Sequence, residues 1–147
     1  VISFSVFGPA LDKKERRKTG NTTGDLLPWV KEGIRIQSIT GKQFYPDWVI
    51  RYYAVNLPQA TEQFIVDTYD NVELVRCNPL PTSERMMILR FLVIDDPTVM
   101  VGIVRDIDSR FTLREVMAVN EWLAAPDHLF HTMRDHGMHM APVMGCC

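Results

Sequence analysis

Two aspartates separated by one residue, Asp106 and Asp108, form the pattern in this sequence with the clearest chemical meaning. In an extended chain they project to the same side, because side chains alternate with a period of two. Two carboxylates that converge repel each other, and a divalent cation relieves that repulsion. Hard oxygen ligands suit Mg²⁺ or Mn²⁺, which keep coordination positions for phosphate oxygens. We therefore expect Asp106 and Asp108 to hold Mn²⁺ or Mg²⁺ beside a phosphate.

Arginines flank this acidic pair at Arg105 and Arg110. They either pair with the acids in an ordinary surface loop or neutralise a bound diphosphate. The segment directly follows residues 99–104, which are apolar on both faces, as in a central buried strand. Ligands of open parallel α/β sheets bind at the carboxyl ends of the strands. This position favours a metal–phosphate site over a surface loop.

Strands alternate with helices along the chain. Strands are expected over residues 1–7, 48–55, 72–75 and 99–104, and helices over 25–32, 58–69, 83–92 and 113–125. Gly33 is expected to end the first helix, Ser83 to cap the third, and Thr112 with Glu115 to form a capping box for the fourth. Residues 48–75 have the size of a parallel βαβ unit. The alternation predicts an α/β fold with a mainly parallel sheet and flanking helices.

Length and composition exclude several classes of protein. The chain has 147 residues with 46% hydrophobic and 23% charged residues, which predicts one domain over residues 1–147. A formal charge of -2 argues against general nucleic-acid binding, and no apolar run is long enough to span a membrane. Three cysteines, two of them adjacent, indicate reduced thiols and a cytoplasmic setting. Because the sequence starts at Val1 and stops at Cys147 without a polar tail, we expect a C-terminally incomplete piece of a longer protein.

Two other readings of the chemistry follow from the residues. A D-x-D pattern also occurs in haloacid-dehalogenase-type phosphatases, but these need a downstream lysine, and the last lysine here is Lys42. A zinc site formed by His136, His139 and a cysteine uses suitable ligands. Its spacing, without a C-x2-C pair, matches no closed zinc finger. The basic cluster over residues 13–18 is expected to be a solvated loop rather than a phosphate site.

An ordered series of motifs resembles a family of GT-A fold glycosyltransferases with an RDxDSR core. The residues that carry the resemblance are Ser3 to Gly8, Tyr45-Pro46 with Trp48, Arg90-Phe91-Leu92, Asp95-Asp96, Arg105 to Arg110, Arg114-Glu115, Ala118-Val119, Glu121-Trp122-Leu123, Phe130-His131 and Met133 to His136. The series is dense from Arg90 to His136. It implies a Rossmann-like fold of the GT-A nucleotide-binding type and transfer of a sugar from a nucleoside-diphosphate donor to a glycan or other acceptor.

The resemblance also implies roles for individual residues. Asp106 and Asp108 would hold the metal, and Phe7 and Gly8 would border the nucleotide. Arg90, Arg105 and Arg110 would bind the donor's phosphates.

Asp135 would lie near the transferred sugar, either as a base or as a ligand of a sugar hydroxyl; its alternative role is a salt bridge to an arginine such as Arg134. The chain departs from the family pattern at residues 85–89, 136–139 and 145–147, and the basic stretch near Lys13 resembles extra sequence. The alternative function is therefore a non-catalytic or zinc-binding interaction module on a degenerate transferase scaffold.

Overall fold

The computed structural model describes residues 1–8, 26–125 and 127–133. The elements in chain order are β1 (Ile2–Phe7), α2 (Pro28–Phe44), β2 (Ile50–Val55), α3 (Gln59–Thr68), β3 (Val72–Arg76), α4 (Ser83–Met87), the 3-10 helix η1 (Ile88–Asp95), β4 (Ile103–Val104) and α5 (Leu113–Leu123). The four strands form one parallel sheet with the order β3-β2-β1-β4. This confirms the predicted α/β class, and the architecture is Rossmann-like.

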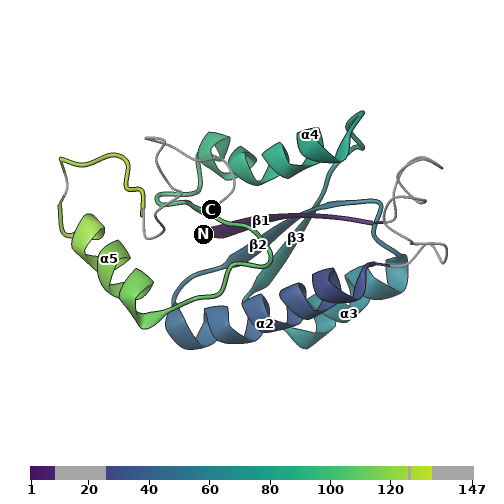
Figure 1. Ribbon diagram of the computed structural model, residues 1–147, viewed down its shortest axis with the longest axis horizontal. Coiled ribbons are helices and arrows are strands. Elements are labelled where there is room, and N and C mark those ends of the chain that lie inside the picture. Colours follow the sequence, from purple (N-terminus) through teal and green to yellow (C-terminus); the bar gives the residue numbers. More distant parts are fainter. Residues whose placement is uncertain (9–25, 126, 134–147) are drawn as a thin grey trace.

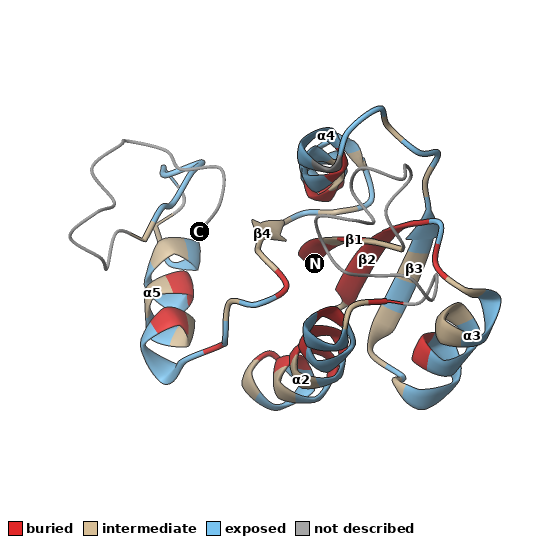
Figure 2. Ribbon diagram, turned by 45° about the vertical axis from the view of Figure 1, so that its right-hand side comes forward, coloured by how far each residue is buried: buried red, intermediate tan, exposed pale blue. Residues whose placement is uncertain are grey.

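Helices cover both faces of the sheet. Helices α2 and α3 lie on one face, and α4 lies on the other (Figure 1). Helix α5 stands to one side, beyond the β4 edge (Figure 2). The core lies between the sheet and α2, where Ile2, Phe4 and Val6 of β1 pack with Ile34. The opposite face of β1 carries Ser3, whose hydroxyl donates to the carbonyl of Arg90 at 2.6 Å and so ties η1 to the sheet.

Helix α2 is longer than its sequence predicts. We expected Gly33 to end it, whereas the helix continues to Phe44, with Pro28 at its first turn. Gly33 lies inside the helix because another part of the chain passes against it: a Cβ there would lie 2.9 Å from the carbonyl oxygen of Ile107. The glycine therefore permits a close approach instead of ending the helix.

Strand β4 is shorter and less buried than predicted. We expected a central buried strand over residues 99–104, but only Ile103 and Val104 pair with β1, and both are half-buried. The N–H of Val99 instead donates a hydrogen bond to the carbonyl of Asp96 at 3.0 Å and so closes a turn, and Met100 is 96% exposed. Among the described strands, β4 is an edge of the sheet and not its centre.

The segment expected to form a helix over residues 83–92 is only partly α-helical. Helix α4 ends at Met87 and continues as the 3-10 helix η1. Its N-cap is Thr82 rather than Ser83, and the Thr82 hydroxyl accepts from the N–H of Arg85 at 3.3 Å. Of the two methionines of this helix, both of which the sequence suggests as core residues, Met86 is buried and Met87 is exposed. The bend between the two helices brings Arg90 over β1.

Helix α5 begins as predicted. The Thr112 hydroxyl accepts from the N–H of Glu115 at 3.2 Å, which confirms this half of the capping box. The other strands and α3 also agree with their predicted ranges within two residues at each end. In the part of the chain that the structure describes, no helix is sufficiently long and apolar to cross a membrane.

Candidate functional site

The acidic pair lies in a turn that directly follows β4. The N–H of Ser109 donates to the carbonyl of Asp106 at 3.1 Å, which closes a four-residue turn over residues 106–109, here called the acidic turn. Ile107 points into the core and Asp108 is exposed. The prediction from an extended chain, in which both aspartates project to one side, therefore does not apply, because the backbone turns between them.

Asp106 forms an ion pair with a buried arginine of η1. The Nη1 atom of Arg90 donates to Oδ1 of Asp106. Arg90 is 5% exposed, and its guanidinium lies 5.7 Å from the ring centroid of Phe91. A charge-assisted bond of this kind neutralises part of the charge on Asp106 and fixes its orientation. The predicted phosphate ligand Arg90 is thus a partner of the acidic turn in this structure.

Arg105 is also engaged by protein groups. Its Nη1 pairs with Oε1 of the buried Glu115, and its Nη2 donates to the carbonyl of Arg110 at 3.1 Å. The guanidinium lies 4.9 Å from the ring centroid of Phe111. These contacts join the end of β4 to the first turn of α5. From the sequence, Arg105 was expected to contact a diphosphate; its partner Glu115 was predicted only as a member of the capping box.

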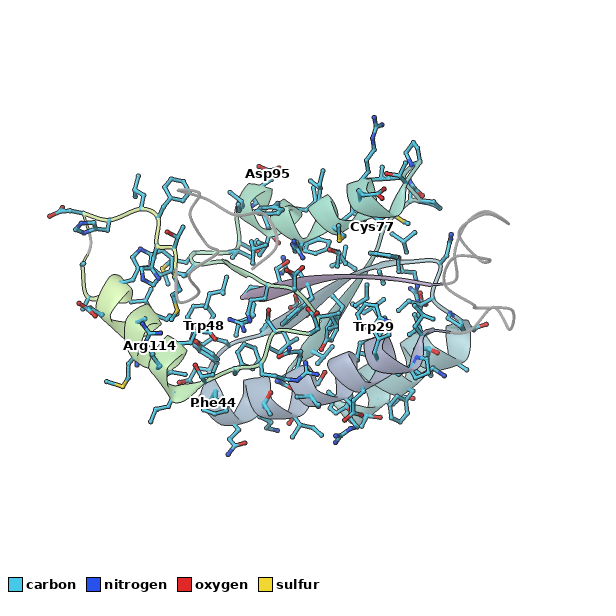
Figure 3. The ribbon with its side chains drawn as sticks, viewed as in Figure 1. Trp29, Phe44, Trp48, Cys77, Asp95 and Arg114 are labelled. Atoms are coloured by element: carbon cyan, nitrogen blue, oxygen red, sulfur yellow. The ribbon has the colours of Figure 1, made fainter. Side chains whose placement is uncertain are left out.

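The buried surroundings of this ion pair include a tyrosine. Burial, together with the negative charge of Glu115, raises the pKa of Tyr45 to about 12. Its ring packs edge-on against Trp48 and Phe111, with centroids 5.5 and 5.3 Å away. Trp48 lies between α5 and the end of α2 (Figure 3). The tyrosine is therefore a neutral part of the core, and Trp48 packs against it.

Asp108 and Arg110 are the exposed charged residues of this segment. Nη1 of Arg110 donates to the carbonyl of Ile107 at 3.3 Å, so the guanidinium lies over the acidic turn. Asp108 has no ion pair with any residue that the structure describes. An exposed carboxylate and an adjacent exposed guanidinium allow this surface to contact both a cation and a phosphate.

The predicted nucleotide-binding residues Phe7 and Gly8 lie at the carboxyl end of β1. Gly8 donates its N–H to the carbonyl of Val55 at 2.8 Å, and a Cβ there would lie 1.9 Å from the carbonyl oxygen of Asn56, so only glycine fits. Strand β4 pairs Val104 with Ser3, near the opposite end of β1. Measured along β1, the acidic turn therefore begins nearer the amino end of the strand than Phe7 and Gly8 do. This holds although the turn follows β4 and Gly8 follows β1, each at its carboxyl end.

Several predicted site residues lie outside the described part of the chain. They are Asp135 with Arg134 and His136, and the zinc candidates His139, Cys146 and Cys147; the basic cluster at residues 13–18, predicted to be a solvated loop, also lies outside it. Within the described residues, no group of three or more His, Cys, Asp or Glu side chains is arranged to hold a metal ion. His131, expected to pack, is exposed but stacks on Trp122 with ring centroids 6.1 Å apart.

No family model, curated protein or solved structure matches the chain. A functional assignment therefore depends on the fold, the acidic turn and the motif series in the sequence. Sequence reasoning also missed two residues of α2 that lie beneath the acidic turn, Gly33 and Gln37. No local signal marks Gln37, and Gly33 resembles a helix end in the sequence; its close approach to Ile107 becomes apparent only in the structure.

Proposed function

We propose that the chain is the nucleotide-sugar-binding domain of a metal-dependent glycosyltransferase of the GT-A type. It would transfer a sugar from a nucleoside-diphosphate donor to a glycan or other acceptor. The observation that carries the proposal is the exposed Asp108 in a turn directly after a strand of an all-parallel sheet. Loops at the carboxyl ends of such strands are where α/β folds bind their ligands. We propose a cytoplasmic setting with it, because three cysteines, two of them adjacent, indicate reduced thiols.

The donor atoms of the acidic turn fit Mg²⁺ or Mn²⁺. These cations bind few protein carboxylates and fill their remaining positions with waters and phosphate oxygens. The turn offers the exposed carboxylate of Asp108, whereas Asp106, two residues earlier in the chain, is engaged at Oδ1 by Arg90. Hard oxygen atoms do not suit a closed structural zinc site, which uses thiolate and imidazole ligands. We therefore assign Asp108 as the principal ligand and Asp106 as its support.

The residues around the turn divide the work of binding a donor. A divalent cation, when bound, supplies positive charge that stabilises the departing nucleoside diphosphate. Arg110 would contact a phosphate oxygen, and the position of its guanidinium over the turn supports this role. Phe7 and Gly8 would border the nucleotide, and Asp135 would act near the sugar as the resemblance implies. Arg90 and Arg105 hold the turn and α5 in place.

Metal-dependent nucleotide binding tests the proposal. Titration calorimetry with UDP and with GDP, each with Mn²⁺ and with EDTA, is expected to show binding only when Mn²⁺ is present. Asp108→Asn should weaken Mn²⁺ binding at least about tenfold, because it removes the principal charged ligand.

Asp95→Asn is the matched control, since Asp95 is an exposed aspartate at the end of η1 (Figure 3). Binding of Mn²⁺ by the control should equal that of the wild type. Lack of Mn²⁺ binding by the wild-type chain, or equal binding by Asp108→Asn, would refute the proposal.

A further inference from the structure

One face of α2 lies directly beneath the acidic turn. Gly33 and Gln37 are four residues apart and so share this face. A Cβ on Gly33 would lie 2.8 Å from Cγ1 and 2.9 Å from the carbonyl oxygen of Ile107. Such distances mean that the turn's backbone rests on the helix without an intervening side chain. Gly33 thus provides the room for this contact.

Gln37 holds the backbone on both sides of Asp108. Its Nε2 donates to the carbonyl of Ile107 at 3.1 Å and to the carbonyl of Ser109. A glutamine amide carries two donor hydrogens, one for each of these carbonyls. The residue is fully buried at 0% exposure. Its contacts therefore fix the two peptide groups that bracket the exposed aspartate.

The oxygen atom of the same amide has fewer hydrogen bonds than its nitrogen. Oε1 of Gln37 is buried and accepts no hydrogen bond from the residues that the structure describes. Burying a polar atom in this way costs free energy, and a methionine of similar length would fill the space without that cost. Packing alone therefore does not explain a glutamine here. The two bonds to the acidic turn supply a reason.

We propose that Gln37 is a positioning residue that fixes the acidic turn so that Asp108 meets the divalent cation. This inference rests on the proposed function, because it names the residue that orders the metal ligand. A ligand that is already ordered loses little conformational freedom when the cation binds. Gln37 acts through the carbonyls of Ile107 and Ser109 and contributes no ligand of its own.

Gln37→Met and Ser38→Ala form a matched pair of variants for the test. Gln37→Met removes both donors while keeping the length of the side chain. Ser38 is the adjacent buried polar residue, and its hydroxyl bonds the carbonyl of Ile34 at 2.8 Å and the Tyr52 hydroxyl at 2.9 Å, away from the turn. Both variants lose buried hydrogen bonds, so both should unfold at lower urea concentration. Only Gln37→Met should affect the turn.

Two measurements separate positioning from stability. Electron paramagnetic resonance of free Mn²⁺ is expected to give a dissociation constant about 10–100-fold higher for Gln37→Met than for the wild type. Ser38→Ala should stay within about twofold of the wild type. Hydrogen exchange of the Ser109 amide, measured by NMR without metal, should be faster in Gln37→Met than in Ser38→Ala, because this amide closes the turn.

Gly33→Ala supplies an independent variant in which Gln37 is retained. Alanine raises helix propensity, yet its Cβ would push against the carbonyl of Ile107, so Mn²⁺ binding should weaken without loss of any donor. If Gln37→Met binds Mn²⁺ as Ser38→Ala does, or exchanges its Ser109 amide at the same rate, the inference is overturned. Lack of Mn²⁺ binding by the wild type refutes the proposed function, and with it the link to a cation. The exchange rates are measured without metal and still decide whether Gln37 orders the turn.

Discussion

Replacing Arg105 and Glu115 singly and together separates a structural role of Arg105 from a role in phosphate binding. The two side chains are 13% and 7% exposed, so both charges are largely withdrawn from water and each offsets the other. Arg105→Met leaves a buried carboxylate, and Glu115→Leu leaves a buried guanidinium. Removing one partner of a buried ion pair costs about 3–5 kcal/mol. We expect about 3 kcal/mol for each single variant, because neither side chain is completely withdrawn from water.

The double variant is expected to be far less destabilised than the two single effects added together. Replacing both charges by apolar side chains removes the uncompensated charge, although the contact of Arg105 with the Phe111 ring is lost. The coupling free energy should be about 2–3 kcal/mol. Urea unfolding followed by tryptophan fluorescence measures it, since Trp122 lies in α5 and Trp48 packs near Phe111.

Nucleotide binding by the same variants completes the test. A structural role of Arg105 predicts that the double variant, once folded, binds Mn²⁺ and nucleoside diphosphate as the wild type does. Single effects that add within about 0.5 kcal/mol would refute the reasoning, because the pair would then be uncoupled. Loss of nucleotide binding in a stable double variant would instead indicate that Arg105 takes part in phosphate binding.

Two further predictions concern stability. Hydrogen bonds from Thr98, and then the Arg51 guanidinium, lower the pKa of Asp96 to about 2. A carboxylate with a lowered pKa stabilises the fold above its unfolded value of about 4 and loses that contribution as the pH falls through about 2. Asp96→Asn should thus lower the urea concentration at the unfolding midpoint at pH 7. As the pH falls from about 4 to about 2, this midpoint should decline less in the variant than in the wild type, and an equal decline would contradict the reasoning. Thr112→Ala removes the N-cap that accepts from Glu115 and should cost about 1 kcal/mol by urea unfolding, whereas Thr112→Ser should restore most of it; equal midpoints would exclude a capping role.

Elements specified by local patterns were predictable from the sequence. Strand β1 and the βαβ unit from β2 to β3 follow from runs of apolar residues separated by turn residues. The start of α5 follows from the hydrogen bond between Thr112 and Glu115, which needs only four consecutive residues. The α/β class then follows from the order of these elements.

Elements that depend on distant contacts were not predictable in this way. Gly33 resembles a helix end locally, but it lies inside α2 because Ile107, more than seventy residues later, passes against it. Residues 99–104 are apolar throughout, yet only two of them pair with β1, since the chain turns at Asp96 and Val99. Local composition does not indicate which apolar residues find a partner strand.

In the candidate site too, local features were predictable from the sequence and distant contacts were not. The D-x-D pattern does follow a strand, although this is the short edge strand β4 and not a buried central one; the ion pairs around the pattern involve Arg90 from η1 and Glu115 from α5. From sequence, Arg90 and Arg105 are cations available to a diphosphate. In the structure, each is paired with a carboxylate at close range, and both guanidinium groups are largely buried.

This pairing has a consequence for how a donor would bind. A bound diphosphate brings more negative charge to a surface where Asp108 is already exposed and Arg110 is the adjacent exposed cation. The charges of Arg90 and Arg105 are offset by Asp106 and Glu115, so they contribute little net attraction. Additional positive charge is therefore needed at the turn before a diphosphate is attracted to it. If a diphosphate binds here as we propose, an arginine-lined phosphate pocket would require these ion pairs to break, whereas a bound cation would leave them intact.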